Sequence, residues 1–96
     1  MVLPLPERVL IREVGPRDGF QNEPESIPTA EKLRLIDLLL DSGLQRIELT
    51  SFVRGDVVPQ LSDAEELLQK LEPREGVTYS ALVPNLRGLE RAVEFA

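Results

Sequence analysis

Histidine, cysteine and tryptophan are all absent from the 96 residues. Without cysteine the chain can form no disulfide, which makes an intracellular, cytoplasmic location the expected one. Without histidine, any site complete within the chain must use carboxylate, amide, hydroxyl, lysine or arginine groups. Aromatic residues make up 4% of the sequence, too few for the base-stacking platform of a protein that binds single-stranded nucleic acid.

Positive charge is also scarce. The formal net charge is −6, which argues against nucleic acid and anionic membrane surfaces as partners. No apolar run approaches the roughly 18 residues of a membrane span. The first residues lack the basic flank of a signal peptide and the Arg/Ser richness of a transit peptide, so we expect neither. Hydrophobic residues reach 42%, enough for the core of one small domain.

Apolar residues alternate between strand-like and helix-like spacing along the chain. Short strands followed by amphipathic helices predict an α/β fold with a parallel sheet. Gly43 is expected to end the first helix, and Asn85 to cap the last. The expected elements are a strand over 9–14, a loop over 15–28, a helix over 30–42 capped by Thr29, a strand over 46–50, a loop over 51–60, a helix opened by a capping box at 62–65, a strand over 77–83 and a helix from 86.

The chemically useful residues follow the strands, where parallel sheets place their sites. Within the second strand, alternation places Ile47 and Leu49 on one face and Glu48 and Thr50 on the other. The first loop contains neither of the glycine-rich nucleotide-binding patterns. The candidate site residues are Arg17, Asp18, Gln21, Glu48, Ser51 and Asn85.

The first loop places an arginine beside an aspartate, between two glycines and next to a proline. Gly15 and Gly19 are expected to provide unusual backbone conformations, and Pro16 to stiffen the turn. Arg17 and Asp18 are then either a surface ion pair or two groups held for a ligand. Just before this loop, the Glu13 carboxylate is equally compatible with solvent and with a site.

Four ordered segments resemble one enzyme family over nearly the whole chain. Residues 13–23 read EVGPRDGFQNE, 48–53 read ELTSFV, 58–60 read VPQ and 83–88 read VPNLRG. Arg-Asp-Gly followed by Gln resembles the first-strand signature of metal-dependent aldolases, lyases and acyltransferases on (β/α)8 barrels. The four segments together resemble the hydroxymethylglutaryl-CoA lyase family. The resemblance implies that residues 1–96 are the N-terminal portion of a single TIM-barrel domain, its first three βα units.

The same resemblance implies cleavage of 3-hydroxy-3-methylglutaryl-CoA to acetoacetate and acetyl-CoA. It makes Asp18 a ligand of Mg²⁺ or Mn²⁺, and Arg17 a catalytic and substrate-binding residue that faces the developing enolate. It makes Glu48 catalytic, with a structural ion pair as the competing reading, and Gln21 and Ser51 substrate-binding. It also implies a homo-oligomeric full-length enzyme. The family's later His-x-His pair, asparagine and cysteine have no counterpart here, so the isolated chain is expected to be inactive.

Two alternatives stay open. One is a condensing enzyme of the isopropylmalate or homocitrate synthase type, although the Gly15-Pro16 and Thr50-Ser51-Phe52 contexts speak against it. The other is a non-catalytic βα module that self-associates through a bare sheet edge. A three-stranded parallel slice leaves an edge and part of a face uncovered, so we expect low stability for the chain in isolation.

Overall fold

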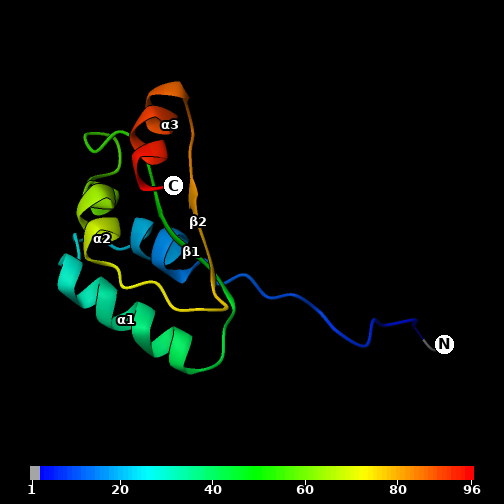
Figure 1. Ribbon diagram of the computed structural model, residues 1–96. Helices are drawn as coiled ribbons and strands as arrows, with labels where there is room; N and C mark the ends of the chain where they lie inside the picture. The colour runs from blue at the N-terminus through cyan, green and yellow to red at the C-terminus, as the bar shows by residue number, and fades with distance from the viewer. Residues whose placement is uncertain (1–2) are drawn as a thin grey trace.

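The computed structural model describes residues 3–96, in which helices and strands alternate around a small parallel sheet (Figure 1). A π-helical turn precedes the first α-helix, and short 3-10 turns precede α2 and follow α3. The elements in chain order are η1 (Gly15–Gly19), α1 (Thr29–Asp41), β1 (Arg46–Ser51), η2 (Pro59–Leu61), α2 (Ala64–Lys70), β2 (Thr78–Leu82), α3 (Leu86–Ala92) and η3 (Val93–Phe95).

The two strands β1 and β2 pair in parallel, as the alternation of elements predicts. Arg46 lies opposite Thr78 at one end of the ladder, and Ser51 lies opposite Leu82 at the other. The register shifts between Glu48 and Thr50. Because the strands run the same way, their carboxyl ends lie at one edge, and the loops that follow them share that edge.

The prediction of a full strand over residues 9–14 is wrong. Only Glu13 joins the sheet, through a parallel bridge to Ile47 in which its N–H donates to Arg46 O and its C=O accepts from Glu48 N–H (3.0 and 2.8 Å). Further rungs before Glu13 would have to face the turn that ends α1, because β1 begins at Arg46. Residues 3–12 are therefore exposed and form an extended tail (Figure 1).

The core lies between one face of β1 and the helices α1 and α2. Ile47 and Leu49 are buried and Glu48 between them is not, which confirms the predicted alternation over residues 47–49; it does not continue, because Thr50 and Ser51 are buried as well. Ile36 and Leu40 of α1 and Leu67 of α2 pack against them. Each such buried side chain contributes about 1.5–3 kcal/mol relative to an exposed one, so this cluster is the main source of stability in the chain.

Of the three predicted helix caps, only Asn85 is confirmed, because its Oδ1 accepts the N–H of Gly88 at 2.7 Å. Thr29 is the first residue of α1, and its hydroxyl donates to Asp63 Oδ2 at 2.5 Å. Ser62 donates to a carbonyl three residues earlier, and α2 begins after Asp63 without a side-chain cap. At Thr29 a partner that is distant in sequence has replaced the expected local one.

The left-handed backbone conformations lie in the turns that close the helices. Gly43 has a φ of 99°, which confirms it as the residue that ends α1, and Gly76 has a φ of 81° in the turn before β2. Side chains with a Cβ are strained in this region, so glycine is required at both turns.

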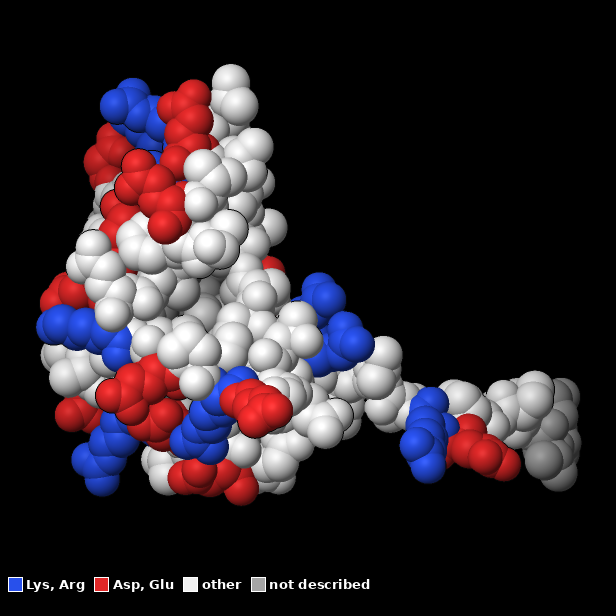
Figure 2. Space-filling view, in the orientation of Figure 1, with Lys and Arg blue, Asp and Glu red and all other residues white. Residues whose placement is uncertain are grey.

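In the view of Figure 2, uncharged residues cover the side along β2, whereas charged residues cover much of α3. Leu82 at the end of β2 and Leu86, Leu89 and Val93 on α3 and after it are all exposed. This surface accords with the expectation that a slice of a larger sheet leaves apolar area uncovered. Across residues 3–96, no helix is both long enough and apolar enough to cross a membrane.

The position of α3 depends on a close approach of backbone to backbone. A Cβ built on Gly88 would lie 2.6 Å from Phe52 O, whereas one built on Gly19 would meet nothing within 4 Å. Any side chain at Gly88 must therefore push α3 away from the end of β1.

We expect Gly88→Ala to lower the free energy of unfolding by about 1–3 kcal/mol, because the overpacking outweighs the better helix propensity of alanine. Urea denaturation measures it, with Gly19→Ala as the matched control. A Gly88→Ala variant as stable as the Gly19→Ala control would show that α3 moves without cost.

Candidate functional site

The Arg-Asp pair lies on a short helical turn, where a loop is predicted. In η1, the Val14 carbonyl accepts the N–H groups of both Arg17 (3.1 Å) and Asp18 (2.7 Å). Pro16 occupies the start of the turn and is buried. These contacts hold the backbone of Arg17 and Asp18 beside β1, just after the bridge that Glu13 makes to Ile47.

The glycines of this turn act differently from the prediction. Neither Gly15 nor Gly19 has a positive φ. Instead, the N–H of Gly15 donates to Glu13 Oε1 at 3.0 Å, and a Cβ at Gly15 would lie 2.8 Å from that oxygen. A Cβ at Gly15 would therefore displace the Glu13 carboxylate, which accepts a hydrogen bond at the entry into the turn.

Arg17 lies between two carboxylates that the sequence places far apart. Its Nε donates to Glu48 Oε2 at 3.1 Å, and its Nη1 lies 3.5 Å from Asp18 Oδ1. The side chains of Arg17 and Glu48 are 23% and 13% exposed, while that of Asp18 is 57% exposed. The inner carboxylate thus holds the guanidinium, and the outer carboxylate stays open to solvent.

The other candidates are less closely associated with this cluster. No hydrogen bond joins Gln21 to Arg17 in the described part of the chain, although Gln21 lies in the helical turn directly after η1. Ser51 is buried, and its hydroxyl has no partner in the structure; the same is true of Thr50. Asn85 serves as a helix cap, as predicted.

The residues around Arg17 match only in part the divalent metal site that the family resemblance implies. The exposed carboxylate of Asp18 is a hard oxygen donor of the kind Mg²⁺ and Mn²⁺ prefer. Within residues 3–96, however, no group of three or more acidic, histidine or cysteine residues is placed to hold a metal ion. Glu48 is engaged by Arg17. The residues present fit the metal as one ligand of a set, with the others still to be supplied.

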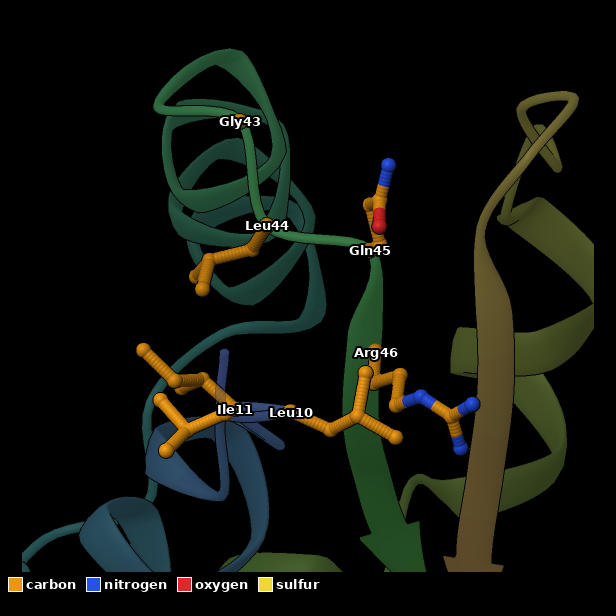
Figure 3. Close-up of a pocket in the computed structure, with 7 residues that line it drawn as sticks. Leu10, Ile11, Gly43, Leu44, Gln45 and Arg46 are labelled. Atoms are coloured by element: carbon orange, nitrogen blue, oxygen red, sulfur yellow. The ribbon is translucent and has the colours of Figure 1, made fainter. Parts of the chain in front are cut away.

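A pocket of about 180 Å³ lies at the opposite end of β1 from Ser51, between the tail and the turn that ends α1. Leu10 and Ile11 of the tail face Leu44 and Arg46 across it (Figure 3). The pocket contains none of the candidate site residues, so it is separate from the Arg17 cluster. Part of its wall is the exposed tail.

The loop after β1 carries a second, exposed arginine–aspartate pair. Arg54 donates to both carboxylate oxygens of Asp56, and this hydrogen bonding lowers the pKa of Asp56 below its usual value. Both side chains are more than 60% exposed. The pair is therefore a solvent-screened surface contact and contributes little to a site.

Sequence reasoning missed one polar cluster next to η1. Lys32 is buried on α1, and its Nζ donates to Asp63 Oδ1 (2.7 Å) and to Gln60 O (2.6 Å). A signal was present in the sequence: Lys32 stands four residues before Ile36 and eight before Leu40, on the face that α1 buries. A lysine in register with the apolar face indicates a buried partner.

An arginine and carboxylates beside parallel βα units are an arrangement typical of α/β enzymes, including α/β barrels. Comparison with known proteins identifies the relatives. The chain is 51% identical over 92 residues to the hydroxymethylglutaryl-CoA lyase of Bacillus subtilis, covering 96% of the chain and 31% of that protein. It is 51% identical over 88 residues to the mitochondrial hydroxymethylglutaryl-CoA lyase of Gallus gallus, covering 92% and 30%.

Solved structures agree. The B. subtilis enzyme superposes with a TM-score of 0.90 at 50% identity, covering 97% of the chain and 31% of that structure. An Acinetobacter baumannii lyase in complex with coenzyme A and 3-methylmalate superposes at 0.85 with 43% identity, covering 90% and 28%. No protein-family model matches. The chain is a homologue of the hydroxymethylglutaryl-CoA lyases and spans about 30% of their length.

The Arg17–Glu48 pair provides a test of the site geometry. Because both side chains are largely withdrawn from solvent, we expect a double-mutant cycle of Arg17→Met and Glu48→Gln to give a coupling free energy of about 1–2 kcal/mol. Urea unfolding of the four proteins measures it.

The exposed Arg74–Asp41 pair is the matched control, for which we expect a coupling several-fold smaller. Equal couplings for the two pairs would mean that Arg17 and Glu48 are no more closely held than two surface charges.

Proposed function

We propose that the chain is part of a metal-dependent carbon–carbon lyase that cleaves 3-hydroxy-3-methylglutaryl-CoA to acetoacetate and acetyl-CoA. The observation that carries this proposal is the identity of about 50% to hydroxymethylglutaryl-CoA lyases over nearly the whole chain. The Arg17–Glu48–Asp18 cluster supports it, because it places a cation between two carboxylates. In this proposal residues 1–96 are the N-terminal portion of one TIM-barrel domain.

The reaction determines what Arg17 has to do. A base removes the proton of the tertiary hydroxyl, the carbon–carbon bond breaks, and negative charge develops on the thioester oxygen of the leaving enolate. A fixed positive charge beside that oxygen lowers the barrier, because it interacts with charge that the ground state lacks. Arg17 is the residue proposed for this role. Its Nε donates to Glu48 and its Nη1 lies near Asp18, so Nη2 is the nitrogen proposed to face the substrate.

Asp18 is proposed as the ligand that this chain contributes to the metal. When bound, a divalent cation such as Mg²⁺ or Mn²⁺ would hold the hydroxyl and carboxylate oxygens of the substrate. The 57% exposure of the Asp18 side chain leaves its oxygens accessible for such a contact.

Glu48 is proposed to act on the reaction chiefly through Arg17, because its Oε2 accepts the hydrogen bond from Nε. Such a contact fixes the plane of the guanidinium, as an arginine that must face one oxygen requires. Gln21 and Ser51 are proposed as substrate contacts. For Ser51 the support is a buried hydroxyl without a partner, since a group of this kind is stabilised by any acceptor that reaches it.

An acyl-CoA substrate is proposed from the lyase relatives, one of which was solved with coenzyme A. A cytoplasmic location is proposed from the absence of cysteine. A homo-oligomeric full-length enzyme is proposed as well, and the exposed apolar residues along β2 and α3 are available for contacts with further parts of the protein.

The two neighbours Arg17 and Asp18 should differ in their kinetic effect in the complete gene product. Asp18→Ala is expected to weaken metal binding and activity together. Arg17→Gln is expected to lower kcat by about 10²–10³ while metal affinity stays close to wild type, because its interaction forms chiefly in the transition state. Mn²⁺ titrations and steady-state kinetics on both variants measure the two effects.

Arg17→Lys is the matched control and should restore little activity, because a point charge does not reproduce the planar fork of the guanidinium. If Arg17→Gln loses metal as severely as Asp18→Ala, yet keeps a near-wild-type kcat at saturating metal, then Arg17 only braces the aspartate. In that case Arg17 and Asp18 form a structural ion pair.

The purified 96-residue chain is expected to release no acetoacetate from 3-hydroxy-3-methylglutaryl-CoA, because Asp18 alone does not complete a metal site. A coupled assay for acetoacetate with Mg²⁺ or Mn²⁺ present measures this, with the complete gene product as the positive control. Release above the no-protein blank would contradict the division of the site between this chain and other residues.

A further inference from the structure

Lys32 is a charged residue that the proposed reaction does not use, yet it lies almost fully buried. Its side chain is 3% exposed and shares the inner face of α1 with Ile36 and Leu40. Two oxygens satisfy its ammonium group: Gln60 O at 2.6 Å and Asp63 Oδ1 at 2.7 Å. Burial of a lysine is costly, so a position that keeps one has a specific set of partners to hold.

These partners connect Lys32 to the segment that leaves η1. The ring of Phe20 lies with its centroid 5.6 Å from the Lys32 Nζ, within the range of a cation–π contact. The side chain of Gln60 donates to Glu23 O at 2.8 Å, while the carbonyl of the same residue accepts from Lys32. Residues 20–23 are thus attached twice to the cluster around Lys32.

The opposite end of the turn is attached to β1. Glu13 makes the parallel bridge to Ile47, and its side chain accepts the N–H of Gly15. Arg17 and Asp18 lie between these two attachments. A short turn fixed at one end alone can pivot, whereas one fixed at both ends keeps its side chains in place relative to the strand.

We propose that Lys32 is a positioning residue for the site: with Gln60 and Phe20 it holds the carboxyl end of η1, and so keeps Arg17 against Glu48 and Asp18 in reach of the metal. The inference rests on the proposed function for the reaction that Arg17 and Asp18 serve. The attachment itself rests on the contacts alone.

If Lys32 served stability alone, its replacement would give a different result from that expected of a positioning residue. The behaviour of buried ion pairs distinguishes these two roles. Replacing both members of such a pair by apolar residues is often neutral or stabilising, whereas removing one member leaves the other charge unpaired. A Lys32→Met/Asp63→Leu double variant therefore restores packing, but not the contacts to Gln60 O and the Phe20 ring. Thr29 keeps Glu66 as an acceptor in that variant.

The experiment compares Lys32→Met, Lys32→Met/Asp63→Leu and the control Lys70→Met in the complete gene product. Lys70 forms an exposed pair with Glu66 and has no contact with η1 among the described residues. The readouts are Tm, hydrogen–deuterium exchange of peptides covering residues 15–23, and kcat and KM with 3-hydroxy-3-methylglutaryl-CoA and Mg²⁺.

We expect the double variant to regain the Tm that Lys32→Met loses. Residues 15–23 should still exchange about tenfold faster than in wild type. It expects kcat about tenfold lower, with KM little changed, because a misplaced catalytic group costs rate more than binding. Lys70→Met should match wild type in all readouts. A double variant that regains Tm, slow exchange and kcat together overturns the proposal.

A milder variant covers the case in which Lys32 substitutions do not fold. Phe20→Leu/Gln60→Ala keeps the Lys32–Asp63 pair and removes the two attachments of residues 20–23. Faster exchange over residues 15–23 at an unchanged Tm supports the proposal, and wild-type exchange there overturns it. If the wild-type protein lacks lyase activity, the proposed function fails, while the exchange data still decide whether Lys32 positions the turn.

Discussion

The structure depends on the way β1 divides its side chains between two environments. Ile47 and Leu49 enter the apolar layer formed with α1 and α2, and Glu48, between them, leaves that layer and meets Arg17. Because the side chains of a strand alternate, the packing that buries the first two also determines where the carboxylate lies. A slip of one residue would place Glu48 in the core and remove the partner of Arg17.

The site follows from this division and from the turn before it. One guanidinium is shared by an inner and an outer carboxylate, and the unequal exposure of the two separates their roles. In the proposed function, the inner carboxylate orients the arginine, whereas the outer one binds a cation. Neither role needs a left-handed backbone: neither glycine of the short π-helical turn has a positive φ, and the Val14 carbonyl holds the turn.

Polar side chains connect the layers that apolar packing leaves uncoupled. Lys32 joins α1 to the start of α2 and to the segment after η1, and Thr29 donates to the same aspartate, Asp63. Arg91 joins α3 to Glu65 of α2 and lies over the ring of Phe52 at 5.4 Å. In a chain whose β2 edge and tail are open, these contacts give the elements a defined arrangement around a small core.

Periodicity and turn residues alone determined β1, β2, the three helices, the glycine that ends α1 and the cap at Asn85, because each is a local property of a few neighbouring residues. The motif strings indicated the family and placed Arg17 and Asp18 in the first loop and Glu48 in the second strand. Tertiary structure decided the remainder. The apolar run at 9–11 is not a strand because β1 offers it no rungs, and Thr29 does not cap because it is the first residue of α1 and its hydroxyl donates to Asp63. Arg17 contacts Glu48, and Lys32 is buried, only because the folded chain brings together residues about 30 positions apart.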